Sequence, residues 1–184
     1  RAARGVIAQP WRRFTYMELP CSLFSLLVRQ ALVLKGNFLA AHPHDWLIWE
    51  PGEWKVPARG QKLAETHGAP LAPVTRPPAG DCLSFELRCP PGVTRIQIGR
   101  APENAIILND ATVSREHIVL EQSGQQWSVR AVRPIKVAGK PVDAGSTVAL
   151  KSGATLVLGG VRLTYLSSTG FLARLKGEAT RLDA

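Results

Sequence analysis

The stretch from Ile96 to His117 reads IQIGRAPENAIILNDATVSREH. Its two apolar runs, 96–98 and 106–108, have the length and β-branched content of short strands. Gly-Arg follows the first run at 99–100, and Ser-Arg-Glu-His follows the second at 114–117. A guanidinium offers a rigid fork of donors that fits phosphate oxygens, and a Ser hydroxyl adds a charge-assisted hydrogen bond. The sequence therefore predicts a phosphate-binding site on two loops at one end of a β-structure.

I-G-R at 98–100 followed by V-S-R-x-H at 113–117 resembles the forkhead-associated (FHA) domain. V-A-G-K-P-V at 137–142 resembles the family's V-N-G turn, and L-K-S-G-A-T-L-V-L-G from Leu150 resembles its closing hairpin, with Ala154 where Asp is usual. FHA domains are β-sandwiches that read phosphorylated motifs through Arg clusters. The resemblance therefore implies a β-sandwich that binds phosphothreonine in a partner protein.

The resemblance gives each matching position a role. Arg100 and Ser114 would contact the phosphate, and Arg115 would assist them. Gly99 would let the backbone turn tightly, and His117 would brace the loop from inside. The other interpretation is that these residues shape the loops alone, because Arg and Ser also bond to backbone groups.

The chain departs from the family after Trp127, where FHA domains usually carry S-x-N-G-T and the Asn holds the peptide backbone. Residues 132–136 here read V-R-P-I-K, in which Pro has no backbone donor and Ile no polar side chain. Arg133 and Lys136 could supply positive charge instead, and Gly139 is a further auxiliary position. A phosphate could then bind with weaker peptide specificity. A degenerate, phosphate-independent scaffold domain would show the same departure.

The rest of the sandwich follows from residue 81 onward, where short strand-like runs alternate with Gly, Pro and Asn-Asp turns. The expected fold class is mainly β: an FHA-like β-sandwich preceded by an N-terminal helix and a short β-hairpin. Composition divides the chain into a basic arm at 1–16, a helix and hairpin region at 17–56, a Pro/Gly-rich linker at 57–80, the sandwich at 81–166 and an amphipathic tail at 167–184. Met17 could be the native start, which would make the arm an upstream remnant.

The N-terminal region predicts two elements. Residues 17–42 read as a helix that Ser22 could cap, with a break at 35–37, and it would pack on the sandwich or bind a partner or a membrane surface. Aromatic-rich runs flank Pro51-Gly52, which suits a type II turn and a short β-hairpin over 46–56. The tryptophans of these runs would pack in the core or stack on a base or peptide.

Composition limits the function classes. The formal net charge is +9, which favours anionic partners, and nucleic acid is the less favoured of these. The three cysteines form no C-x-x-C pair, and His42, His44 and Asp45 stand without further ligands nearby, so we expect no disulfide framework and no metal site. Polar residues interrupt the apolar run at 23–41, which predicts no membrane span.

No Gly-rich nucleotide loop, G-x-S-x-G or H-E-x-x-H motif is present. The sequence therefore predicts a binding protein with no catalytic residues and no cofactor. We expect a cytoplasmic, phosphothreonine-dependent module in Ser/Thr kinase signalling, whose partner is a phosphothreonine-containing kinase or kinase substrate. The alternative is an FHA-like scaffold domain that assembles with proteins independently of phosphate.

Overall fold

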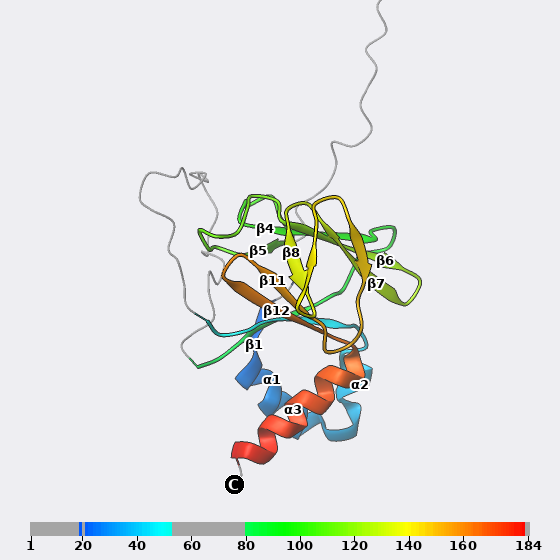
Figure 1. Cartoon of the computed structure of the whole chain (residues 1–184). Helices are drawn as coiled ribbons and strands as arrows, with labels where there is room; N and C mark the ends of the chain where they lie inside the picture. The colour runs from blue at the N-terminus through cyan, green and yellow to red at the C-terminus, as the bar shows by residue number, and fades with distance from the viewer. Residues whose placement is uncertain (1–18, 20, 53–79, 183–184) are drawn as a thin grey trace, which may run out of the picture.

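A computed structural model describes residues 19, 21–52 and 80–182 of the chain. Two β-sheets pack face to face, and the helices cover the outside of one of them (Figure 1). In the described part, the larger sheet has the order β1-β3-β2-β12-β11-β8-β9 and the smaller sheet β10-β7-β6-β4-β5. The β-sandwich that the sequence predicts is therefore confirmed.

Nearly all strand pairs are antiparallel, and β4 with β5 is parallel. The strands are β1 (Cys21–Leu23), β2 (Trp46–Trp49), β3 (Leu83–Glu86), β4 (Arg95–Gly99), β5 (Ile106–Ile107), β6 (Ile118–Ser123), β7 (Gln126–Ala131), β8 (Ile135–Val137), β9 (Lys140–Val142), β10 (Thr147–Ala149), β11 (Thr155–Leu158) and β12 (Val161–Leu166).

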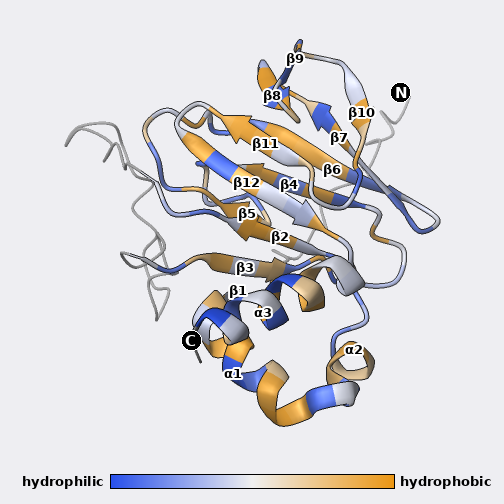
Figure 2. Ribbon diagram, turned by 60° about the horizontal axis from the view of Figure 1, so that its bottom comes forward, coloured by the Kyte–Doolittle hydropathy of each residue, from blue (hydrophilic) through white to orange (hydrophobic). Residues whose placement is uncertain are grey.

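Two apolar layers hold these elements. Alternate residues of a strand face opposite sides of its sheet, and β2 uses both sides. Leu47 and Trp49 lie in the core between the sheets, whereas Trp46 and Ile48 lie in a second core beneath the helices. This double burial explains why all four residues of β2 have large side chains with apolar surface. Figure 2 shows the hydrophobic colour on β2.

The predicted hairpin over 46–56 is wrong. β2 lies between β3 and β12, so both of its edges are occupied, and it pairs with β3 in the register Trp46 with Glu86 and Trp49 with Leu83. The run at 54–56, the second half of the predicted hairpin, lies outside the described residues. The local Pro-Gly turn signal was outweighed by pairing with a strand distant in sequence, and the sandwich takes β1 and β2 from the 17–56 region.

The predicted cap at Ser22 is also wrong, because Ser22 belongs to β1, which pairs with β3. Helix α1 (Phe24–Leu34) begins after Leu23 without a side-chain N-cap from that residue. Asp81 serves this helix end instead, accepting hydrogen bonds from the Ser25 amide at 3.2 Å and the Ser25 hydroxyl at 2.7 Å. A carboxylate at a helix N-terminus is favourable. The predicted break is confirmed as the 3₁₀ helix η1 (Lys35–Asn37) before α2 (Phe38–Ala41).

The C-terminal helix α3 (Ser168–Leu182) packs against α1 and β12. Its Phe171 stacks on Trp46 with ring centroids 4.2 Å apart and meets Phe24 edge to face. Trp46 and Trp49 therefore have the packing role that the sequence left open. The tail thus adds a helical layer to the outer face of the larger sheet.

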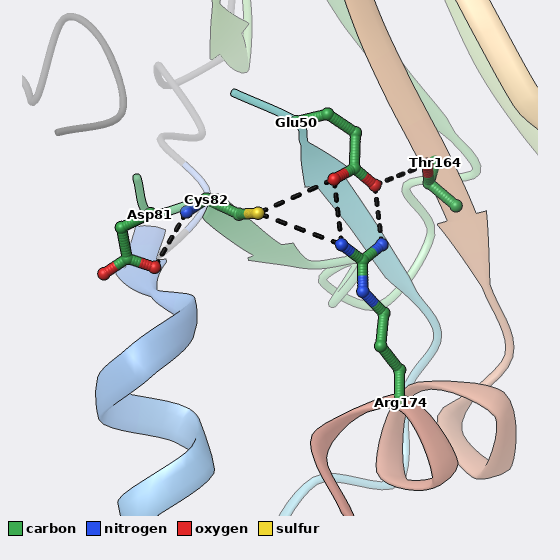
Figure 3. A network of polar contacts seen from close by, with 5 residues as sticks. All are labelled: Glu50, Asp81, Cys82, Thr164 and Arg174. Atoms are coloured by element: carbon green, nitrogen blue, oxygen red, sulfur yellow. Dashed lines mark hydrogen bonds and ion pairs between the residues drawn. The ribbon is translucent and has the colours of Figure 1, made fainter. Parts of the chain in front are cut away.

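A polar network fastens α3 to the sheet (Figure 3). Arg174 donates two hydrogen bonds to the Glu50 carboxylate, at 2.6 and 2.8 Å, and Thr164 donates a third at 2.6 Å. Burial opposes ionisation of Glu50, but these bonds outweigh it and hold the pKa of the carboxyl below its usual value. Burial and the charge of Glu50 raise the pKa of the neighbouring Cys82 thiol to about 12. The thiol is therefore protonated at neutral pH.

One segment of the described chain, Phe24–Ala41, is long and apolar enough to cross a membrane by length and composition. In the structure this segment is divided into α1, η1 and α2. Phe24, Leu27 and Phe38 are buried beneath α3, whereas Val33 is 80% exposed. The absence of a membrane span therefore stays a prediction.

The turn between β8 and β9 predicts a stabilising substitution. Ala138 and Gly139 have φ of 48° and 79°, so both central residues of this two-residue turn are left-handed. Ala pays a steric cost in this conformation that Asn largely avoids. Ala138→Asn is expected to stabilise the fold by about 1 kcal/mol and to raise Tm by about 2–4 °C in thermal unfolding followed by circular dichroism.

Ala144→Asn is the matched control, since Ala144 is exposed in a turn and has no positive φ. It is expected to leave Tm unchanged. Equal Tm values for the two variants would contradict the turn argument.

Candidate phosphate-binding site

The two motifs that the sequence singles out lie side by side. The backbone amides of Arg100 and Ala101 donate hydrogen bonds to the carbonyls of Ser114 and Arg115, at 2.8 and 3.1 Å. These bonds join the β4–β5 loop to the β5–β6 loop. The structure therefore brings Gly99, Arg100, Ser114, Arg115 and His117 together at one end of the sandwich.

Gly99 is required by this close approach. A Cβ at position 99 would collide with the carbonyl oxygen of Arg115 and lie 2.8 Å from its carbonyl carbon. The φ of Gly99 is not in the left-handed region. The family resemblance implies a tight turn as the reason for glycine at position 99. The structure gives a different reason: the backbone of the second loop occupies the space that a side chain at position 99 would need.

Asn104 joins the same two loops from inside. Its side-chain amide donates to the carbonyls of Ala101 and Arg115 at 2.8 and 2.6 Å, and the residue is buried. Sequence reasoning missed this residue. The available signal was an Asn in a short polar loop between strands, where Asn side chains commonly bond to nearby backbone.

Asp110 and Thr112 fix the second loop to the opposite sheet. Asp110, 1% exposed, accepts from the Thr112 amide at 2.8 Å, and the Thr112 hydroxyl accepts from the Gly160 amide at 2.7 Å. Gly160 lies in the turn between β11 and β12. The loop that carries Ser114 is therefore anchored at both its start and its end.

His117 holds the Ser114 loop from beneath. Its Nδ1 accepts a hydrogen bond from the Ser114 amide at 3.0 Å, and the side chain is buried. Burial lowers the pKa of the imidazole, which the Pro134 carbonyl opposes and the charge of Arg133 reinforces. The ring is thus neutral at pH 7, and an unprotonated Nδ1 is what this bond needs. The geometry fits the bracing role that the sequence predicts.

The Arg100 guanidinium is fixed through one of its nitrogens. Its Nε donates to the Val113 carbonyl at 3.2 Å, which fixes the plane of the guanidinium. Within the described residues, no acceptor bonds to its terminal nitrogens and no partner bonds to the Ser114 hydroxyl. Several donors are therefore available on adjacent loops for one anionic group.

Arg115 extends from the same loop into solvent. Its side chain is 75% exposed and lies 3.7 Å from the Glu103 carboxylate of the β4–β5 loop. An exposed ion pair of this length contributes little to stability. Arg115 is therefore able to exchange Glu103 for a phosphate.

The three auxiliary positions, Arg133, Lys136 and Gly139, lie in different places relative to the phosphate loops. The Arg133 amide donates to the His117 carbonyl at 3.1 Å, so the β7–β8 loop adjoins the site. Lys136 is exposed on β8. Gly139 lies at the far end of β8, in a turn whose Ala138 amide donates to Thr155 at 2.8 Å. Arg133 is thus beside the site, and Gly139 is not brought to it.

Other candidate sites gain no support. Among the residues that the structure describes, no group of three or more His, Cys, Asp or Glu side chains could hold a metal ion. His42 instead lies 3.3 Å from the Glu86 carboxylate. Trp46, Trp49 and Trp127 are buried and cannot stack on a nucleic-acid base.

Comparisons with known proteins found one matching family and several similar solved structures. The sequence model of the FHA domain matches residues 96–159. A comparison with curated proteins found no match. Similar solved structures include EmbR of Mycobacterium tuberculosis in complex with a low-affinity phosphopeptide (26% identity over 41% of this chain and 20% of that one, TM-score 0.38). They also include the FHA domain of CT664 from Chlamydia trachomatis (16% identity, 67% and 97%, TM-score 0.45).

A third similar structure is the N-terminal FHA domain of Rad53p from S. cerevisiae in complex with a phosphothreonine peptide (16% identity, 44% and 73%, TM-score 0.39). The chain spans only a fifth of the EmbR chain. The matched residues contain both loops of the site and the strands that carry them. This chain therefore carries an FHA domain over residues 96–159.

Proposed function

We propose that the chain binds phosphothreonine in a partner protein through Arg100, Ser114 and Arg115. The observation that carries this proposal is the guanidinium of Arg100, fixed through Nε while its terminal nitrogens remain available beside the Ser114 hydroxyl. A phosphate has close to two negative charges at pH 7 and takes short, charge-assisted hydrogen bonds. Preformed donors on anchored loops bind it without a large ordering cost.

The FHA domain gives this proposal its family context. EmbR and the Rad53p domain were solved with a phosphopeptide and a phosphothreonine peptide, respectively. We extend this ligand class to the present chain, together with a cytoplasmic role downstream of a Ser/Thr kinase. The partner would be a kinase or a kinase substrate.

The β7–β8 loop limits which parts of a bound peptide, besides the phosphate, the site can recognise. Residues 132–135 read Val-Arg-Pro-Ile about where the family usually has Asn-Gly-Thr, and Pro134 is exposed and cannot donate a hydrogen bond. Recognition of the peptide backbone is therefore expected to be weak. Phosphate-independent scaffolding is the alternative that remains if the phosphate does not bind.

The direct test is isothermal titration of phosphothreonine, phosphoserine and unphosphorylated versions of a degenerate peptide library. The proposal expects binding that requires the phosphate and favours phosphothreonine. Equal affinity for phosphorylated and unphosphorylated peptides would sink it and favour the scaffold alternative.

Glu103 provides an internal check on the role of Arg115. Because the Glu103 carboxylate competes for Arg115, Glu103→Gln is expected to tighten phosphopeptide binding by about two- to threefold, the scale of an exposed ion pair. The gain should vanish in the background of Arg115→Gln. Glu116→Gln, which removes another exposed charge from the neighbouring loop, tests the general effect of net charge. An equal gain from both single variants would argue against a specific competition.

A further inference from the structure

We propose that Lys136 and Arg162 select phosphothreonine ligands with acidic residues on one side of the phosphothreonine. This inference rests on the proposed function and adds a ligand preference to it. The two cations belong to β8 and β12 of the larger sheet, outside the loops that would hold the phosphate.

The strand register places both side chains on one face. Lys136 is opposite Val157 on β11, and Val157 is opposite Arg162 on β12. Directly opposed residues point to the same side of a sheet. The flanking residues of all three strands are buried in the core, so this row faces outward, and both cations are exposed. With neighbouring strands about 4.8 Å apart, the two positions are roughly 10 Å from each other.

The row lies at the same end of the sandwich as the phosphate loops. β12 begins directly after Gly160, whose amide bonds to Thr112 two residues before Ser114. β8 begins directly after Pro134, in the loop that adjoins His117. Each cation is the second residue of its strand, counted from this end. A ligand seated on Ser114 therefore has the row beside it.

A hollow next to Arg162 leaves room for a ligand. It has a volume of about 220 Å³ and is lined by the end of β2, by Pro51 and Gly52, and by Gly160 to Arg162. The Gly160 amide that anchors Thr112 belongs to this lining. The hollow thus adjoins the turn that separates the phosphate loops from the basic row.

Both cations are free to pair with an external acid. Neither takes part in an ion pair or side-chain hydrogen bond within the described residues. Glu50 lines the hollow, but Arg174 and Thr164 already hold its carboxylate. Asp143 follows the edge strand β9, and in the described part of the chain no ion pair joins it to either cation. The row therefore presents uncompensated positive charge.

An extended peptide advances about 3.3 Å per residue. Acidic side chains a few residues from the phosphothreonine can therefore reach the row. Each pair would be exposed, so the expected gain is small for one residue and larger for a short acidic block. The pairs would weaken as salt screens them.

The test uses phosphothreonine peptides with three Asp residues either before or after the phosphothreonine, and matched peptides with three Asn residues. Affinities are measured for the full chain and for Lys136→Gln, Arg162→Gln and the double variant. Lys151→Gln is the control, because Lys151 is an exposed cation in the turn at the opposite end of β11.

One Asp peptide is expected to bind about five- to tenfold more tightly than its Asn counterpart, and the double variant to lose that difference. Lys151→Gln should retain it. Equal binding of all phosphopeptides would overturn this inference while leaving the proposed function intact. No binding of any phosphopeptide would overturn both.

Discussion

Arg100→Ala is expected to weaken phosphothreonine-peptide binding by about a hundredfold, since a charged hydrogen bond contributes about 1.5–3 kcal/mol and each 1.4 kcal/mol is tenfold. The substitution removes the fixed guanidinium and leaves the backbone bond from residue 100 to Ser114 in place. The fold should therefore survive. Isothermal titration with one phosphothreonine peptide measures the loss, and thermal unfolding checks the fold.

Arg95→Ala is the matched control. Arg95 is an exposed arginine at the start of β4, the strand that ends just before Arg100, and pairs with Glu121 on the outer face of the smaller sheet. Its removal subtracts the same charge and should leave the affinity almost unchanged. Arg100→Lys should recover only part of the affinity, because an ammonium lacks the planar fork. Similar losses from Arg95→Ala and Arg100→Ala would mean that net charge, and not the site, binds the peptide.

Gly99→Ala is expected to lower the free energy of unfolding by about 3 kcal/mol or more, in the range of severe overpacking. The new methyl group would meet the Arg115 carbonyl, which is backbone and cannot rotate away. The loops would separate, the Arg100–Ser114 backbone bond would weaken, and phosphopeptide binding would fall with stability. Urea unfolding followed by tryptophan fluorescence measures the change.

Gly36→Ala serves as the control for this prediction. A Cβ at Gly36 has nothing within 4 Å, and the residue lies in η1, away from the phosphate loops. This variant should be neutral or slightly more stable, because Ala loses less backbone entropy than Gly. A Gly99→Ala protein as stable as Gly36→Ala would show that the two loops are not in close contact.

The sequence was sufficient for the sandwich because its signals are local. Alternating apolar residues, as in Trp127, Val129 and Ala131 of β7, report burial on one face, and the motifs report the loops between strands. Contacts between segments that are distant in sequence could not be predicted in this way. The partner of β2 lies beyond a long Pro/Gly-rich segment, and the residue that serves the start of α1 is Asp81, distant in sequence from Ser25.

The same distinction holds within the site. The sequence singles out Arg100, Ser114 and His117 because their side chains have recognisable chemistry at motif spacing, and the structure brings them together. Asn104 and Asp110 could not be found in this way, because their role is to bond to backbone groups of the second loop, and that geometry exists only after folding. Gly99 was found for the wrong reason, since a close approach and a tight turn both favour glycine.

The most direct test of a phosphothreonine site on these loops is an NMR titration of the amide resonances with a phosphothreonine peptide and its unphosphorylated counterpart. We expect that the phosphopeptide alone shifts the resonances of residues 99–101 and 113–117, and that Arg100→Ala abolishes these shifts. Equal shifts with both peptides, or shifts confined to the helices, would contradict the assignment of a phosphothreonine site to these loops.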